Sequence, residues 1–304
     1  GQRECDVAIY ILRQARVPGF MGLDVPTEAE GLAGVARRRI MGDHCAMSLA
    51  PVRQMPSAVR RRVDTLFTDI DDTMTTRGLV PAAAFSALWR AREAGLAVVL
   101  VTGRPAGWCD HLARMWPVAA VVGENGALAF AMEGEQIRRI FAPREPAAVQ
   151  GLERIRQRVL QEVPGCRIAA DQAYREYDLA VDFDEEVHLG PEAADRIAAI
   201  FREEGAVAKI SSIHVNGWYG DHDKLTMCRR ASQELLGREL DPDAAVYVGD
   251  SPNDEPMFRA FPHAVGVANV RHWVDRMTHL PAYVTEQEGG QGFAEVVDTL
   301  VQGR

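Results

Sequence analysis

Two aspartates, Asp69 and Asp71, stand two positions apart in the sequence LFTDIDDT, directly after an apolar run typical of a buried strand. Alternation along an extended chain places both side chains on one side, at the strand end where α/β sheets bind ligands. Unpaired buried carboxylates are costly, so a purely structural strand has little reason to end in three aspartates. The alternative is a turn that caps the next segment. We favour a ligand site.

A second group of carboxylates follows another predicted strand. Residues 244–248 run into the sequence GDSPND, which contains Asp250, Asn253 and Asp254. A turn rich in turn-forming residues is the alternative explanation. Carboxyl ends of parallel strands meet at one edge of a sheet, so we expect this group beside the first one.

The remaining two features suit the binding of an anion. Residues 96–101 lead into Thr102 and Gly103, although a helix N-cap would have the same sequence. Lys224 opens a predicted helix, with a solvated surface lysine as the alternative. The chain has 34 basic residues but only two lysines, Lys209 and Lys224. A retained lysine indicates a place that needs a compact point charge rather than a planar guanidinium.

The elements that must position these residues form an α/β pattern from residue 63 onward, with apolar strands alternating with amphipathic helices. We predict strands at 65–70, 96–101, 118–122, 244–248 and 264–267, a short strand at Tyr283, and helices at 81–95, 105–115, 225–236 and 293–301.

An α+β insert interrupts this pattern between residues 128 and 219. We predict a hairpin of strands 128–132 and 136–141, helices 146–163 and 191–204, two strands within 167–183, and strand structure over 206–218. A core interrupted by a second module suggests a ligand site between the two. Residues 1–62 read as an N-terminal appendage, with a linker over 46–57.

The composition excludes several classes of protein. There are 34 basic and 43 acidic residues, a net charge of −9, whereas nucleic-acid binders need a basic surface, so we predict no nucleic-acid partner. The longest apolar runs are too short to cross a bilayer, so we predict no membrane partner. Five scattered cysteines without a CxxC pair favour a reduced, cytoplasmic setting.

Taken in order, DxDxT, an apolar strand followed by Thr, a Lys and GDxxND resemble the four motifs of the haloacid dehalogenase (HAD) superfamily. The insert lies between the second and third motifs, as in subfamily IIB, which has a larger α/β cap. The sequences GENGA, GDSPND and GGQGF are similar to phosphatases of phosphorylated sugars, mannosyl-3-phosphoglycerate phosphatase most closely. The chain departs from many relatives at Asp72, where they have Gly, and residues 1–62 have no counterpart.

This resemblance implies a Rossmann-like, parallel-sheet HAD core of α/β class with an inserted α+β cap. The core would comprise residues 63–127 and 220–304, and the cap, which would select the substrate, residues 128–219. Residues 1–62 would be an N-terminal extension of unknown role.

The resemblance also implies catalytic roles. Asp69 would attack phosphorus and form an aspartyl phosphate, while Asp71 would protonate the leaving alkoxide and then deprotonate the attacking water. Thr73 would position Asp71 and its loop.

The resemblance further implies the groups that bind phosphate and metal. Mg²⁺ would be the cofactor, held by the Asp69 carboxylate, the Asp71 backbone carbonyl and the Asp250 carboxylate. Asp254 would support these ligands from outside and pair with Lys224. The expected phosphate-binding residues are Thr102, Gly103, Lys224 and Asn253.

Substrate choice is expected to reside in the cap, because the core motifs bind only phosphate, nucleophile and metal. The candidate specificity residues are Arg175, Glu176, Lys209, His214 and Asn216. A surface ion pair between Arg175 and Glu176, with ordinary strand polarity elsewhere, is the alternative.

Together these features predict a Mg²⁺-dependent phosphomonoester hydrolase that acts on a small phosphorylated metabolite, a sugar phosphate or a phosphoglycerate derivative. Two rivals stay open: a phosphomutase on the same core and a non-catalytic sensor of phosphate ligands. A binding protein has no need of the nucleophile and acid pair Asp69 and Asp71. The oligomeric state is left open.

Overall fold

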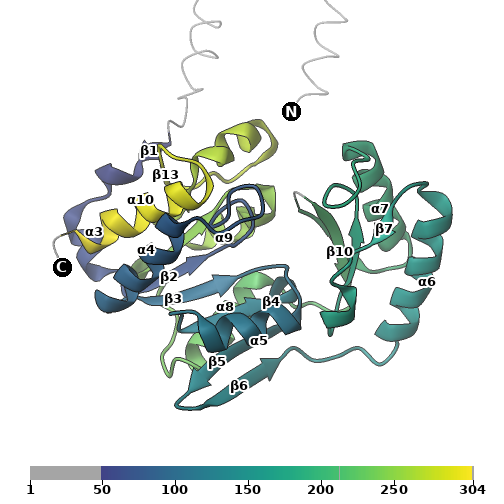
Figure 1. Cartoon of the computed structure of the whole chain (residues 1–304), viewed down its shortest axis with the longest axis horizontal. Coiled ribbons are helices and arrows are strands. Elements are labelled where there is room, and N and C mark those ends of the chain that lie inside the picture. The colour runs from purple at the N-terminus through teal and green to yellow at the C-terminus, as the bar shows by residue number, and fades with distance from the viewer. Residues whose placement is uncertain (1–48, 212, 303–304) are drawn as a thin grey trace, which may run out of the picture. The chain divides into compact units, whose positions relative to one another are not determined.

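The computed structural model describes residues 49–211 and 213–302, so most of the predicted N-terminal extension, residues 1–48, lies outside the described residues. Its larger sheet has nine strands in the order β1-β13-β12-β11-β2-β3-β4-β5-β6 (Figure 1). From β1 to β4 all neighbours are parallel, and β5 and β6 continue the sheet antiparallel. The predicted α/β class with a mostly parallel core sheet is confirmed.

The core elements follow the predicted order closely. The strands are β1 (Ala50–Pro51), β2 (Thr65–Thr68), β3 (Ala97–Val101), β4 (Ala120–Gly123), β5 (Leu128–Glu133), β6 (Gln136–Phe141), β11 (Ala245–Gly249), β12 (Val265–Gly266) and β13 (Tyr283–Val284). The α-helices are α3 (Ser57–Arg62), α4 (Ala82–Glu93), α5 (Ala106–Met115), α8 (Lys224–Glu234), α9 (Glu255–Ala260) and α10 (Gly289–Val301).

The core sheet is buried on both faces, which explains why its parallel strands are apolar throughout rather than alternating. In β2, Leu66 packs into one apolar cluster with α4, α5 and α10, whereas its neighbour Phe67 packs into the other with α8 and α9. In β3, Val98 and Val99 divide in the same way. Polar side chains that are to reach a ligand must therefore lie at the ends of these strands.

The inserted module is a separate four-stranded antiparallel sheet in the order β7-β8-β10-β9. It comprises α6 (Ala148–Glu162), β7 (Arg167–Ile168), β8 (Leu179–Asp182), α7 (Pro191–Glu203), β9 (Val207–Ile210) and β10 (His214–Trp218). Helices α6 and α7 cover one face with an apolar cluster that includes Val215 of β10. Alternation turns the neighbours His214 and Asn216 to the opposite face, toward the core.

The hairpin β5–β6 corrects the predicted start of the insert at residue 128. Leu128 and Ala129 are fully buried, on opposite faces of the core sheet, and Gly123 of β4 pairs with Leu128. The hairpin therefore completes the core, and the cap begins after Phe141. The sequence of a hairpin does not show which neighbouring strand it pairs with, so the pairing with β4 could not be predicted from it.

The N-terminal boundary predicted at residue 62 also needs correction. Ala50 and Pro51 pair with β13 at the edge of the core sheet, and Val52 and Met55 are buried in the core. Residues 49–62 thus belong to the core unit, which begins at Leu49. The Pro and Met content that suggested a linker instead forms an edge strand and a short 3₁₀ turn, η1 (Val52–Gln54).

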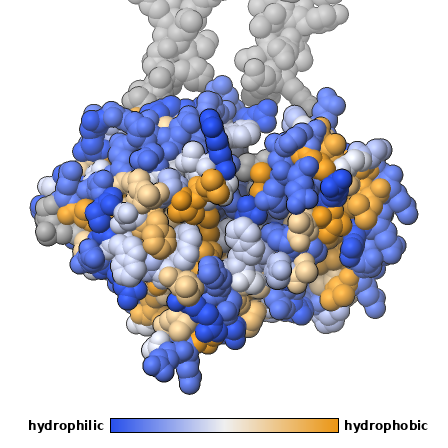
Figure 2. All heavy atoms as spheres, in the orientation of Figure 1, coloured by the Kyte–Doolittle hydropathy of each residue, from blue (hydrophilic) through white to orange (hydrophobic). Residues whose placement is uncertain are grey.

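The outer surface in the view of Figure 2 is largely hydrophilic, with apolar patches interrupted by polar residues. Among the helices of the described residues, none combines the length and apolar character needed to span a membrane.

The contribution of residues 49–56 can be measured by comparing a chain that starts at Leu49 with one that starts at Ser57. The shorter chain loses β1 and the buried Val52 and Met55, each worth about 1.5 to 3 kcal/mol. We expect its melting temperature to fall by roughly 10 °C relative to the longer chain. Equal melting temperatures in calorimetry would contradict this packing.

Candidate active site

Three adjacent parallel strands deliver the predicted motifs to one edge of the core sheet. Strand β2 leads into Asp69 and Asp71, β3 into Thr102, and β11 into Asp250. Their order β11-β2-β3 places the Asp69 segment in the middle. This is the edge at which α/β sheets bind ligands.

Lys224 lies at the centre of this group. Its Nζ atom donates to Asp69 Oδ1 at 2.8 Å, to Asn253 Oδ1 at 2.9 Å and to Asp254 Oδ1 at 3.1 Å. Lysine has three donors, and all three are used. Lys224 therefore joins the first and fourth motifs.

The charges in this cluster shift one another's titration. Burial raises the pKa of Asp69 to about 7, with Asp254 and Asp71 adding to the rise and Lys224 opposing it. Burial would lower the pKa of Lys224, but the charges of Asp254 and Asp69 outweigh it and the net shift is upward. Lys224 therefore stays charged and stabilises the anionic form of Asp69.

Asp254 is a fully buried support for the loop after β11. Tyr247 donates its hydroxyl to Asp254 Oδ1 at 2.5 Å, and the backbone N–H of Asp250 donates to Asp254 Oδ2 at 3.0 Å. A Cβ atom at Gly249 would lie 2.4 Å from Asp254 Oδ2, so only glycine fits there. Asp254 thus holds Asp250 in place through the Asp250 backbone N–H.

The loop after β2 explains the unusual Asp72. Its φ of +55° lies in the left-handed region, where Gly is at ease and Asp is among the better-tolerated residues. Thr75 Oγ1 accepts from the Asp72 N–H at 2.9 Å, and Asn269 donates to its carbonyl at 2.6 Å. Thr73, predicted to position this loop, donates to Asp250 Oδ1 at 3.2 Å instead of to Asp71.

The carboxylates of this edge fit a hard divalent cation. Burial raises the pKa of Asp250 well above its usual value, and the charges of Asp254 and Asp69 add to the rise. The single ammonium of Lys224 does not offset these three carboxylates, so a further cation is favoured. In the described part of the chain no three His, Cys, Asp or Glu side chains form a ready metal site. A Mg²⁺ ion, which keeps several waters, would thus also need backbone oxygen and solvent.

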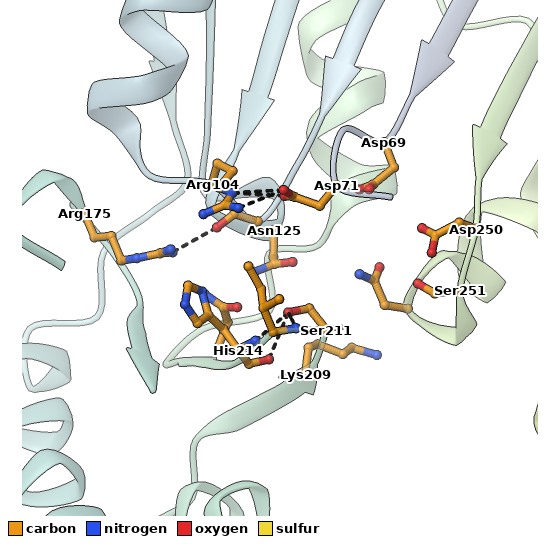
Figure 3. Close-up of a pocket in the computed structure, with 14 residues that line it drawn as sticks. Asp69, Asp71, Arg104, Asn125, Arg175, Lys209, Ser211, His214, Asp250 and Ser251 are labelled. Carbon is orange, nitrogen blue, oxygen red and sulfur yellow. Dashed lines mark hydrogen bonds and ion pairs between the residues drawn. The ribbon is translucent and has the colours of Figure 1, made fainter. Parts of the chain in front are cut away.

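Arg104 is a site residue that the sequence reasoning missed. Its guanidinium donates to both carboxylate oxygens of Asp71, the closest contact being 2.8 Å (Figure 3). It also donates to Glu185 Oε1 of the cap at 3.1 Å. It also lies over the Trp108 ring at 4.7 Å. Arg104 thus connects the predicted acid to the cap. Its position directly after Thr102 and Gly103 was the available signal.

Two predicted cap residues differ sharply in position. Arg175 lines the pocket, but its guanidinium is buried and bound to Asp171, to Asp178 and to the Gly103 carbonyl at 2.9 Å. The Glu176 side chain is 55% exposed, pairs with Arg144 and lies outside the pocket lining. Arg175 and Glu176 therefore do not pair with each other, and only Arg175 reaches the pocket.

The other three cap candidates line the pocket. Asn216 donates to Asp178 Oδ2 at 2.9 Å, and His214 Nε2 lies 2.8 Å from Glu185 Oε2 and holds the pKa of Glu185 down to about 2. Lys209, on β9, is exposed at the mouth, and its side chain makes no ion pair or hydrogen bond within residues 49–211 and 213–302. Its ammonium is therefore available to an anionic ligand.

These residues surround a narrow cavity of about 30 Å³ between core and cap. Figure 3 shows Asp69, Asp71, Asp250 and Ser251 on the core side and Lys209, Ser211 and His214 on the cap side. Gly103 and Asn253 also line it, whereas Thr102, Thr73, Lys224 and Asp254 lie behind the lining. Thr102 accepts the Arg104 N–H at 3.0 Å, so it shapes the loop that presents Gly103.

Several known proteins are similar to this chain in sequence or fold. Residues 66–147 match the family model of the haloacid dehalogenase-like hydrolases. A phosphoglycolate phosphatase of Methanopyrus kandleri is 27% identical over 242 residues, which are 78% of this chain and 97% of that protein. A solved structure from Thermoplasma acidophilum has a TM-score of 0.63 at 21% identity, covering 78% of this chain and 98% of that one. A solved HAD subclass IIB sugar phosphatase has a TM-score of 0.56 at 16% identity, covering 78% of this chain and 98% of that one.

The two structural likenesses concern the fold, since the identities are low. The family match spans the segments that carry Asp69, Asp71 and Thr102, and the similarity to the curated relative extends over 78% of the chain. Residues 66–147 thus match the haloacid dehalogenase-like hydrolases in sequence, and the motifs converge at one edge of the core sheet.

Proposed function

We propose that this chain is a Mg²⁺-dependent phosphomonoester hydrolase that works through an aspartyl-phosphate intermediate. Its broad class is that of a phosphatase acting on phosphorylated small molecules. The observation that carries the finer proposal is the placement of Asp69: its carboxylate is held by Lys224 at 2.8 Å and opens onto a pocket that Asp71 also lines. This arrangement supports a nucleophile and an acid acting on one ligand.

In the first step, an Asp69 carboxylate oxygen forms a bond to phosphorus while the bond from phosphorus to the ester oxygen breaks. Asp71 gives a proton to the leaving alkoxide. In the second step, Asp71 takes a proton from water, the water oxygen bonds to phosphorus, and the Asp69–phosphorus bond breaks to release phosphate.

The surrounding residues hold the phosphoryl group and offset its charge. The Gly103 segment and Asn253 line the pocket and would bind phosphate oxygens, and Lys224 neutralises Asp69 from behind. Mg²⁺, held by Asp69, Asp250 and the Asp71 carbonyl, would supply positive charge that reduces the repulsion between the carboxylates and the anionic substrate.

For the substrate we propose the phosphate ester of a small hydroxy acid. The unpaired ammonium of Lys209 at the mouth of the pocket supports a leaving group that carries a negative charge. Phosphoglycolate, named in a curated relative, has this chemistry. Sugar phosphates and phosphoglycerate derivatives, expected from the sequence, are the competitors that a substrate panel must include.

The nucleophile assignment is tested by Asp69→Asn, which keeps the shape but removes the attacking oxyanion. We expect the release of phosphate from 2-phosphoglycolate and from p-nitrophenyl phosphate to fall by about a thousandfold or more. Asp243→Asn, the same change at an exposed position, serves as the control. Turnover by Asp69→Asn at the rate of the control would refute the mechanism. Analysis of the products distinguishes release of phosphate from its return to a substrate, as in a mutase.

The metal is tested by chelation of the purified protein. We expect activity to disappear in excess chelator and to return with Mg²⁺, since two carboxylates and a carbonyl suit an ion that keeps its waters. Ca²⁺ should inhibit, because its looser and higher coordination misplaces the nucleophile. Full turnover in the presence of chelator would show that the carboxylates act without a metal.

The role of Lys209 is tested by Lys209→Ala. Loss of one charge-assisted contact should raise KM for 2-phosphoglycolate by about 10- to 100-fold. Hydrolysis of p-nitrophenyl phosphate, which has no carboxylate, should change less than about threefold. Lys209→Arg keeps the charge and should recover part of the loss. Equal effects on both substrates would place the recognition of the leaving group elsewhere.

A further inference from the structure

Glu124 is a buried carboxylate that the proposed chemistry does not use. It lies in the GENGA sequence, in the 3₁₀ turn η2 (Glu124–Gly126) after β4, and its relative exposure is 0%. Glu124 and Asn125 have φ angles of +45° and +54°, a left-handed conformation that is unfavourable for two successive residues other than glycine. Such strain persists only where the surroundings hold it, and it concentrates at functional positions.

The carboxylate of Glu124 accepts four backbone N–H groups. Oε1 accepts from Ala106 at 2.9 Å and from Glu176 at 2.8 Å, and Oε2 accepts from Tyr177 at 2.6 Å and from Asp178 at 3.1 Å. Ala106 is the first residue of core helix α5, whereas the other three donors are consecutive residues of the cap. One core side chain therefore binds three successive amides of the cap.

The bound cap segment leads directly to the pocket. Asp178 binds both the Arg175 guanidinium and the Asn216 amide, each at 2.9 Å. Arg175 in turn donates to the carbonyl of Gly103, the loop predicted to bind phosphate. The Glu124 carboxylate therefore fixes, through Asp178, the positions of Arg175 and Asn216, two cap residues that line the pocket.

The same turn also contacts the chain where it returns from the cap. A Cβ atom at Gly126 would lie 2.0 Å from the backbone oxygen of Asp223, next to Lys224. Asn125, between these two contacts, lines the pocket. Residues 124–126 therefore touch the cap, the pocket and the start of α8.

We propose that Glu124 is a positioning residue that docks the cap segment 176–178 on the core and so sets the geometry of the substrate pocket. The docking itself stands on the contacts alone, and its effect on turnover rests on the proposed function.

Glu124→Gln is a sharp test, because the change keeps the size of the side chain. One carboxylate oxygen becomes an NH₂ group, which cannot accept a hydrogen bond. If the NH₂ replaces Oε2, Tyr177 and Asp178 lose their acceptor, and if it replaces Oε1, Ala106 and Glu176 lose theirs. Either orientation leaves a cap amide unpaired. Glu133→Gln, the same change at an exposed position on β5, is the matched control.

The primary measurement is backbone hydrogen exchange of the full chain at pH 8. Burial raises the pKa of Glu124 to about 7, Asp178 adds to the rise and the backbone donors oppose it, so the carboxylate is ionised at this pH. We expect exchange at residues 176–178 to accelerate about tenfold or more in Glu124→Gln, with β2 and β3 unchanged. Unchanged exchange at 176–178, or an equal rise throughout the core, would overturn the proposal.

Kinetics then separate this proposal from the proposed function. In Glu124→Gln we expect kcat/KM for 2-phosphoglycolate to fall about 10- to 1000-fold and that for p-nitrophenyl phosphate to fall less than about threefold. Equal losses on both substrates would refute a role through the cap. If the unmodified chain hydrolyses neither compound, the proposed function fails, and the exchange measurement still decides the docking.

Discussion

The buried ion cluster of Lys224 with Asp69 and Asp254 is the interaction on which the rest of the site depends. The carboxylates of Asp69 and Asp254 repel each other in this buried environment, and the Lys224 ammonium that binds both offsets this repulsion. Removal of one partner would leave an uncompensated charge, which is far costlier than loss of a surface pair. The cluster also ties the start of α8 to the ends of β2 and β11, so the order of the motifs along the chain becomes a single site in space.

A second layer of constraint joins the core to the cap. Arg104 holds Asp71 with one side of its guanidinium and Glu185 of the cap with the other, and Glu124 binds the cap backbone. These contacts enclose the pocket from two directions. The roles proposed for Lys209 in substrate recognition and for Asp71 in protonation would therefore depend on one shared arrangement of core and cap.

Much of the core could be predicted from the sequence, because strands buried on both faces are continuously apolar and their polar ends stand out. The three residues that Lys224 binds, Asp69, Asn253 and Asp254, were predicted as site residues because they follow such strands. The assignment of the hairpin β5–β6 was wrong because pairing with β4 leaves no mark on the hairpin's own sequence. Arg104 was missed because its partner Glu185 lies 81 residues away. Arg175 is buried because it binds Asp171 and Asp178, whereas its neighbour Glu176 is exposed. These partners cannot be inferred from the fact that Arg175 and Glu176 are adjacent in the sequence.

The contacts of Glu124 have a consequence for how such an enzyme can diversify. The three cap groups that it binds are main-chain amides, which every amino acid except proline possesses. Docking of the cap therefore places almost no demand on which side chains occupy these positions. New cap sequences can arise, and new substrates be acquired, while the junction with the catalytic core stays the same.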